Sequence, residues 1–222
     1  MNTVIRHHWR WILSALLLGL LPLQLRAESG YQEGVHYQKL ESAVITRDPG
    51  KIEVIEVFWY GCPHCYKLEP TLQHWSANLS RDVDFWRSPA MWNGRMELHA
   101  QAFYTAEALN LLEKLHKPLF DALNPQGQQL ASKEEIRTLF TRQGVKAEEF
   151  DQVFDSFGVQ SKVKQANSRF RALRLSGVPA FIVNGKYRVT GEKLKSEDEM
   201  LKVVDYLIGQ ERKARAAPAA VR

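Results

Sequence analysis

The segment Cys62-Pro63-His64-Cys65 constrains this chain most, because it contains both of the two cysteines found in 222 residues. The β-branched and aromatic run 53–59 before it is typical of a buried strand. The apolar residues after it, over 66–75, recur at close to helical spacing. The pair is therefore predicted to lie where a buried strand is followed by a helix, with Cys62 at the helix N-terminus.

This position predicts redox chemistry for the pair. Free N–H groups and the helix dipole favour a thiolate at Cys62. Pro63 suits the first helical turn, because its missing N–H would have no partner there. Cys65, one turn further on, is expected to lie beneath Cys62. The two residues would then form an attacking thiol of lowered pKa and a second thiol that resolves a mixed disulfide.

The residues alone leave other functions of such a pair open. A zinc site usually needs four ligands, and no second cysteine pair exists, while His7 and His8 belong to a segment expected to be removed. A purely structural disulfide would close so short a loop that it constrains little unfolded-chain entropy. Two further alternatives are a copper or zinc carrier that uses Cys62, Cys65 and His64, and a peptide-binding chaperone in which the disulfide is incidental.

Residues 1–27 have the pattern of a cleavable secretory signal peptide. Arg6 and Arg10 precede an apolar run that ends near Leu23, and Ala27 offers a small residue for cleavage. The run is shorter than the ~20 apolar residues of a spanning helix, which argues against a membrane anchor. Cleavage would remove three arginines and no acids, and the formal charge would fall from +5 to +2. The basic composition therefore does not indicate a nucleic-acid partner.

The rest of the chain is predicted to be an α/β structure interrupted by helices. Residues 28–92 contain the cysteine motif and a second strand, expected to run parallel to the first because a helix connects them. Residues 93–170 show only helical patterns, including one long helix at 96–115, and predict an all-helical insert. Strand patterns return within 171–209, and the tail 210–222, which lacks an apolar face, is predicted to be disordered.

Asn184-Gly185 predicts a β-hairpin, because it lies between two β-rich runs. Together with Cys62-Pro63-His64-Cys65 and Gly177-Val178-Pro179, this hairpin resembles the DsbA family of bacterial periplasmic thiol:disulfide oxidoreductases. The resemblance covers about residues 31–209 and implies a thioredoxin-like fold with an inserted all-helical domain. Pro-His between the cysteines is its specific part, since thioredoxins typically carry Gly-Pro and protein disulfide isomerases Gly-His.

The resemblance also implies roles for individual residues. Cys62 would be the nucleophile, Cys65 the resolving thiol, and Pro179 a cis-proline that faces the disulfide. A cis bond would leave the Val178 backbone free to pair with an extended substrate. The alternative is an ordinary trans proline at the start of a strand. His64 either lies on the surface without a role or favours the Cys62 thiolate by charge or hydrogen bonding.

Glu56 is unusual in the predicted strand, because its alternate neighbours Val54 and Phe58 are apolar. It is either a strand-end carboxylate that reaches water or a buried acid beneath the cysteines, where such groups shift pKa and serve function. Arg87 is expected to pair with Glu56 if the two strands are neighbours. By the resemblance, Glu56 and Glu69 match two acids of the family, and Arg87 stands where the family carries a lysine.

The function implied is donation of a disulfide to secreted proteins as they fold in the periplasm. The expected partners are these thiol-bearing proteins and a quinone-linked inner-membrane oxidase of the DsbB type. We expect a monomer with no metal, no other cofactor and no nucleic-acid partner. The nearest alternative is a disulfide isomerase or reductase of the same fold, and a metal-binding carrier is a more distant one.

Overall fold

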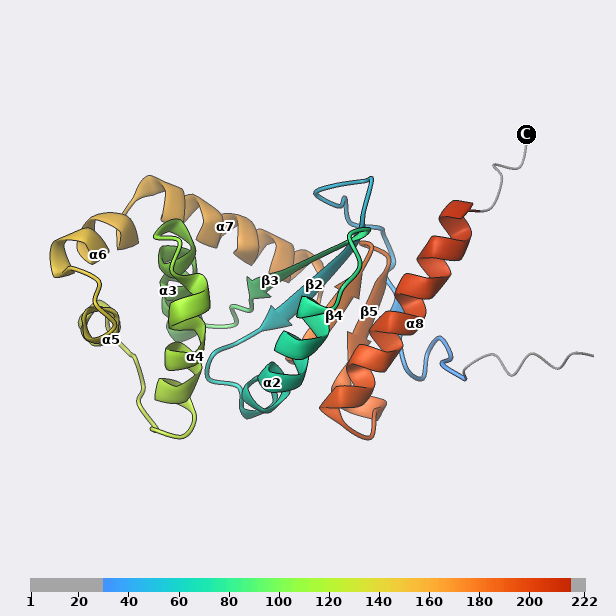
Figure 1. Cartoon of the computed structure of the whole chain (residues 1–222), viewed down its shortest axis with the longest axis horizontal. Helices are drawn as coiled ribbons and strands as arrows, with labels where there is room; N and C mark the ends of the chain where they lie inside the picture. The colour runs from blue at the N-terminus through green and yellow to red at the C-terminus, as the bar shows by residue number, and fades with distance from the viewer. Residues whose placement is uncertain (1–29, 217–222) are drawn as a thin grey trace, which may run out of the picture. The chain divides into compact units, whose positions relative to one another are not determined.

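The computed structural model describes residues 30–216, so the predicted signal peptide lies outside the described residues. The chain is built on a five-stranded mixed sheet with the order β1-β5-β4-β2-β3 (Figure 1). β2 pairs in parallel with β3 and antiparallel with β4, and β5 pairs antiparallel with both β4 and β1. The strands are β1 (Gln38–Lys39), β2 (Ile52–Phe58), β3 (Val83–Pro89), β4 (Ala180–Val183) and β5 (Tyr187–Thr190).

Both faces of the central strand β2 are buried, which accounts for the apolar character of five of its seven residues. Ile52 and Val54 pack beneath α2 (Pro63–Ala77) and α8 (Glu197–Ala216), which lie side by side on one face of the sheet (Figure 1). Ile55 and Val57 point to the opposite face and pack against residues near the end of α7. Because side chains alternate along a strand, Glu56 lies on the same face as Val54, toward α2.

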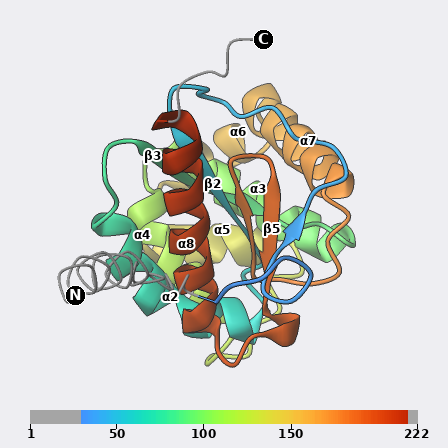
Figure 2. The same ribbon diagram turned by 90° about the vertical axis from the view of Figure 1, so that its right-hand side faces the viewer.

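Five helices follow β3 and precede β4, as the prediction of an inserted helical domain requires. Figure 2 shows the molecule turned by 90°, with α6 and α7 at the upper right, to one side of the strands. The insert has an apolar core in which Phe103, Phe120, Phe140 and Phe150 are buried. None of the helices in residues 30–216 is long and apolar enough to cross a membrane. The inserted helices are α3 (Gly94–Ala108), α4 (Leu112–Leu123), α5 (Lys133–Arg142), α6 (Ala147–Phe154) and α7 (Phe157–Ala172).

The prediction of a single long helix at 96–115 is wrong. Asn110 adopts a positive φ of 56°, and the chain turns there between α3 and α4. Asparagine tolerates this left-handed conformation better than most residues, so it can end a helix where the composition still favours one. The residues after the turn form α4, which contains Pro118.

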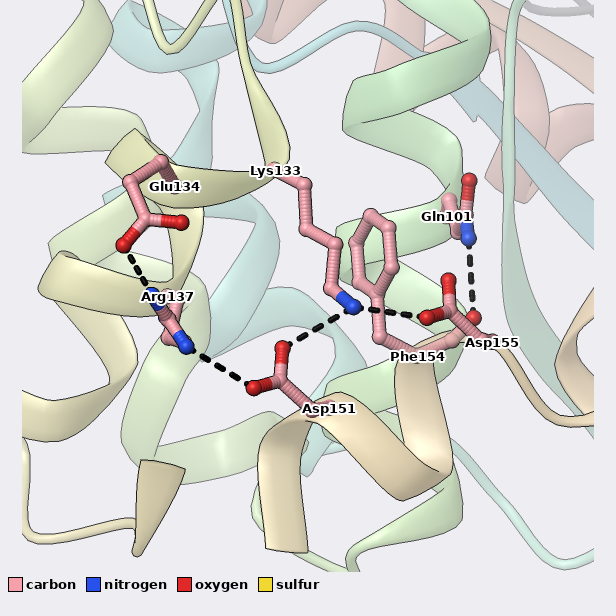
Figure 3. Close-up of polar contacts among 7 residues, drawn as sticks. All are labelled: Gln101, Lys133, Glu134, Arg137, Asp151, Phe154 and Asp155. Carbon is pink, nitrogen blue, oxygen red and sulfur yellow. Dashed lines mark hydrogen bonds and ion pairs between the residues drawn. The ribbon is translucent and has the colours of Figure 1, made fainter. Parts of the chain in front are cut away.

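Surface ion pairs join the helices of the insert (Figure 3). Lys133 Nζ lies 2.9 Å from Asp151 and 2.6 Å from Asp155, and Arg137 contacts Asp151 at 2.8 Å, which links α5 to α6. Arg137 also pairs with Glu134 within α5. Because exposed pairs of this kind contribute at most about 1 kcal/mol each, the apolar core supplies most of the insert's stability.

The disorder predicted from Gln210 onward is wrong as far as Ala216, because α8 continues to that residue. Polar contacts in place of an apolar face hold this last part of the helix. The buried Glu211 accepts hydrogen bonds from Asn184 Nδ2 at 2.5 Å and from Lys186 Nζ at 2.7 Å. Arg212 pairs with Asp82 at 2.6 Å. Partners so distant in the chain leave no local pattern in the sequence.

The predicted hairpin at Asn184-Gly185 is confirmed. Both residues have positive φ, 49° and 62°, as the tight turn between β4 and β5 requires. Gly185 also lies against the backbone of the segment after β1, because its carbonyl accepts a hydrogen bond from Val44 N at 2.8 Å. A Cβ atom on Gly185 would lie 2.0 Å from the Val44 carbonyl oxygen. This contact excludes every side chain.

Gly185→Ala is therefore expected to lower the free energy of unfolding by about 3 kcal/mol or more, because the new methyl group would clash with buried backbone. Gly127→Ala is the matched control, because Gly127 also has a positive φ of 64° but has open space around the new methyl group. The control should cost only about 1 kcal/mol, the penalty of the left-handed backbone alone. Urea unfolding of both variants measures the difference, and equal losses would contradict the assigned clash.

Candidate active site

The cysteine pair lies where β2 is followed by α2, as predicted. Cys62 is the N-cap residue of α2 with extended backbone angles, and Pro63 occupies the first turn. The backbone N–H of Cys65 donates to Cys62 Sγ at 3.5 Å. Both cysteines are buried free thiols, and Cys65 has no exposed surface while Cys62 retains 5%. The sulfur of Cys62 is therefore the one placed for attack.

The two thiols have opposite pKa shifts. The hydrogen bond from the Cys65 thiol is the largest cause that lowers the pKa of Cys62, to about 6, and backbone N–H groups and the charge of His64 add to it against the effect of burial. Burial is the largest cause that raises the pKa of Cys65 well above its ordinary value, followed by its interaction with Cys62. Near neutral pH the reduced pair therefore holds one thiolate, at Cys62, and one thiol.

His64 is exposed but has a partner. Its Nδ1 lies 2.8 Å from Glu197 Oε1 at the start of α8, although 71% of its side chain is accessible. Lys67 Nζ contacts the other oxygen of Glu197 at 3.1 Å. The hydrogen bond from His64 is the largest cause that lowers the pKa of Glu197 to about 2. Sequence reasoning missed Glu197, because nothing local to either residue indicates a contact between segments so far apart in the chain.

The Val178–Pro179 peptide bond is cis, which confirms that prediction. Cys62 Sγ lies 3.3 Å from the Val178 carbonyl oxygen, so this segment lies directly against the reactive sulfur. A groove of about 450 Å³ extends from there, between the first turns of α2 and α8 and the segment that follows β5, which includes the short helix η1 (Gly191–Lys193). A larger hollow of about 1300 Å³ lies along β3 and the far end of α2, away from Cys62.

Glu56 is completely buried, so the strand-end interpretation is wrong. Its Oε2 accepts from Arg87 Nε at 2.9 Å, which confirms the predicted pairing of the two strands' side chains. Arg87 also donates to Glu69 Oε1 of α2 at 2.9 Å. Burial is the largest cause that raises the pKa of Glu56 to about 8, and Arg87 opposes it. Glu56 also raises the pKa of Cys65 through its charge, so the carboxyl acts directly on the site.

Two further residues that the sequence did not indicate join this buried group. His116 of α4 lies with Nε2 3.5 Å from Glu69 Oε2 and with Nδ1 2.8 Å from the Tyr60 hydroxyl. Both are buried, so the group connects the sheet, α2 and the insert. A histidine within a helical apolar pattern carries no signal of this contact. Within residues 30–216, no three His, Cys, Asp or Glu side chains are grouped to hold a metal ion.

Comparison with known proteins agrees with this geometry. Residues 74–200 match the family model described as a DSBA-like thioredoxin domain. The thiol:disulfide interchange protein DsbA of Azotobacter vinelandii is 40% identical over 210 residues, covering 92% of this chain and 98% of that protein. DsbA of Bordetella pertussis is 37% identical over 204 residues, covering 91% of this chain and 96% of its own.

Solved structures give the same result. The crystal structure of Pseudomonas aeruginosa DsbA superposes with a TM-score of 0.81 at 40% identity, over 84% of this chain and 97% of that one. The oxidoreductase DsbA from Xylella fastidiosa superposes with a TM-score of 0.76 at 30% identity, over 82% and 98%. The predicted thioredoxin-like fold with a helical insert is thereby confirmed. With its Cys62-Cys65 pair at the N-terminus of α2, the chain belongs to the DsbA family of thiol:disulfide oxidoreductases.

Proposed function

We propose that this protein donates the Cys62–Cys65 disulfide to exported proteins as they fold, with Cys62 as the sulfur that is attacked. The observation that supports this best is the pKa of Cys62, lowered to about 6 beside a fully buried Cys65. A stabilised thiolate favours the reduced form of the pair. The oxidised form is then a strong oxidant, which suits a donor better than a reductase.

The transfer takes two exchange steps. A substrate thiolate attacks Cys62 Sγ, the Cys62–Cys65 bond breaks, and Cys65 leaves and takes up a proton, since its pKa is raised well above the ordinary value. A second substrate thiolate then attacks the substrate sulfur of the mixed disulfide and expels Cys62 as a thiolate. The substrate gains a disulfide and loses two electrons, which the cysteine pair receives. Cys62 is the better leaving group of the two cysteines because of its low pKa.

The substrate is proposed to bind as an extended segment beside Val178 and Pro179. The Val178 carbonyl lies 3.3 Å from Cys62 Sγ, so a peptide that pairs with this backbone would bring its own sulfur to the reactive one. Main-chain pairing gives affinity with little dependence on sequence. The adjoining groove, lined by side chains of α2 and α8, would hold residues next to the substrate cysteine.

We place the protein in the periplasm as a monomer, after cleavage of residues 1–27, because a disulfide donor needs an oxidising compartment. A quinone-linked membrane oxidase of the DsbB type would return the reduced pair to the disulfide. Inner-membrane vesicles with added quinone should then reoxidise the purified reduced protein, and failure to do so would remove this partner from the proposal.

The disulfide transfer is tested with a reduced, unfolded protein that contains two cysteines. Oxidised wild-type protein should oxidise it mole for mole, as thiol titration would measure. Cys65→Ser should instead accumulate a mixed disulfide at Cys62 when mixed with the oxidised substrate, because no resolving thiol remains. Cys62→Ser should form none. Non-reducing electrophoresis and mass spectrometry identify the complex, and equal trapping by both variants would contradict the assignment of Cys62.

His64→Leu is expected to raise the pKa of Cys62 by about one unit, because the charge of the imidazole favours the thiolate. The oxidising power should fall by about 30 mV for this two-electron couple. Thiolate absorbance against pH and the redox equilibrium with glutathione measure the two effects. Lys67→Leu is the matched control, because it removes the other cation paired with Glu197. Unshifted curves for His64→Leu would assign the acidity to the Cys65 thiol and the backbone N–H groups at the helix N-terminus.

The proposed role of Glu56 is to hold the proton that Cys65 releases or takes up. Its folded-state pKa of about 8 lies above the ordinary carboxyl value of 4.5, so the folded protein binds this proton more tightly than the unfolded chain does. The resulting stabilisation is complete at a pH below 4.5, the ordinary carboxyl pKa, and is lost as the pH rises through about 8, the folded-state pKa. Glu69 remains as a partner for Arg87 if Glu56 is replaced.

Glu56→Gln should therefore flatten the pH dependence of stability. Wild type and variant should diverge as pH rises from about 5 to about 9, with the variant gaining roughly 1–3 kcal/mol relative to wild type. Urea unfolding of the reduced proteins across this range is the measurement. Parallel curves would show that Glu56 has the same pKa in the folded and unfolded states.

A further inference from the structure

Within residues 30–216, β3 leaves the longer of the two open edges of the sheet. It is the last strand in the order β1-β5-β4-β2-β3 and has seven residues, whereas β1 at the other end has two. Native proteins usually shorten, cover or charge such edges, because their free main-chain groups bind other extended chains. A seven-residue edge without a neighbouring strand is therefore a candidate binding surface.

The register identifies the main-chain groups that β3 leaves free. The carbonyl of Asp82 and the N–H of Ala90 bond to β2, at the two ends of β3. Because successive residues of a strand face opposite sides, the even-numbered residues of β3 face β2 and the odd-numbered ones face outward. Within residues 30–216, the N–H and C=O groups of Phe85 and Arg87 have no hydrogen-bond partner. Pro89 has no N–H, so the free row ends with Arg87.

This edge borders the hollow of about 1300 Å³ that lies away from Cys62. Five consecutive residues, 83–87, contribute to its wall, although their side chains alternate between the two faces of the sheet. A strand does so where its edge, rather than one of its faces, borders the space. The rest of the wall includes Gln73 and His74 of α2 and Glu107 and Leu112 of the insert. The edge is therefore recessed between these elements.

Free main-chain groups in such a recess select an extended, unfolded partner. A folded protein has its own N–H and C=O groups paired, whereas an extended segment of a non-native chain carries a free row that can pair with the edge. A second copy of this chain is a poor partner. Its β3 edge is recessed in the same way, so the walls of the two hollows would collide before the strands met.

The charges at one end of the hollow favour an acidic partner. Lys51 precedes β2 and Arg81 precedes β3, so both lie at the same end of the parallel pair. Both are exposed, and neither is in an ion pair within residues 30–216. Of the acids in the wall, Asp84 and Glu107 are already in ion pairs, which leaves Glu113 of the insert. Acidic side chains of a partner therefore meet two available cations at this end.

We propose that the free edge of β3 binds an extended, acidic segment of a non-native polypeptide as an added strand, at a surface separate from Cys62. The added strand pairs with the N–H and C=O groups of Phe85 and Arg87. Its acidic side chains lie beside Lys51 and Arg81. This binding goes beyond disulfide donation and does not depend on it, because no sulfur atom takes part.

The test uses a capped, cysteine-free peptide of alternating threonine and valine with two aspartates at each end, and amide exchange of the protein followed by nuclear magnetic resonance. At saturating peptide, the N–H groups of Phe85 and Arg87 should exchange about tenfold more slowly, because they gain an acceptor. Val83 is the internal control, since it faces the same edge but already donates to the Ser80 carbonyl at 3.0 Å. Slower exchange beside Val178 instead, or protection of Phe85 and Arg87 before peptide is added, would overturn the proposal.

A matched pair of variants tests the charges. Lys51→Glu/Arg81→Glu should weaken peptide binding about tenfold, because attraction becomes repulsion. Lys146→Glu/Lys164→Glu changes the net charge equally on exposed residues of the insert outside the hollow, and should bind the peptide like wild type. Fluorescence anisotropy of a labelled peptide measures both. Equal losses in the two variants would overturn the assignment of the acidic side chains to this end of β3.

A modified peptide tests the pairing of main chains. Methylation of all its central nitrogens removes the donors from both of its edges, so its affinity should fall about tenfold or more. Retained affinity would show that side chains alone hold the peptide, and would overturn strand addition.

Discussion

The chemistry of this protein depends on the position of one sulfur atom at the N-terminus of α2. Cys62 caps the helix, accepts the N–H of Cys65 at 3.5 Å and reaches the Val178 carbonyl at 3.3 Å. The strand before it is buried on both faces and fixes where the helix begins. Gly61 permits the approach, because the indole of Trp59 lies 2.4 Å from where a Cβ atom would be. The scaffold thus stabilises a thiolate with fixed backbone dipoles, which take the place of water.

A buried polar group connects the helical insert to the sheet and α2. Glu56, Glu69, Arg87 and His116 come from four different elements, β2, α2, β3 and α4. The Arg87 contacts join β3 to β2 and α2, whereas the contact between His116 and Glu69 exists only when the insert packs against α2. Polar groups in such surroundings are costly when one partner is missing, so the group is sensitive to that packing.

Much of the site could be predicted because its signals are local. The strand and helix around Cys62 follow from periodicity, and the pairing of Glu56 with Arg87 follows from two adjacent parallel strands in register. The cis peptide bond before Pro179 was predicted from the resemblance to a known family. The contact between His64 and Glu197 could not be predicted, because it joins residues 133 positions apart at an exposed surface. The same limit applies to His116, which occupies an ordinary position in a helical pattern.

By itself the sequence determined the reactive pair, the order of strands and helices and the hairpin at Asn184-Gly185, since these depend on residue type, spacing and backbone preference over a few positions. Only the tertiary structure decided the break between α3 and α4 at Asn110, the extension of α8 to Ala216 and the partners of the buried carboxyls. The physical reason is that helix ends and buried charges are settled by competing contacts. A polar residue is stable wherever a partner satisfies it, and those partners come from elements far away in the chain.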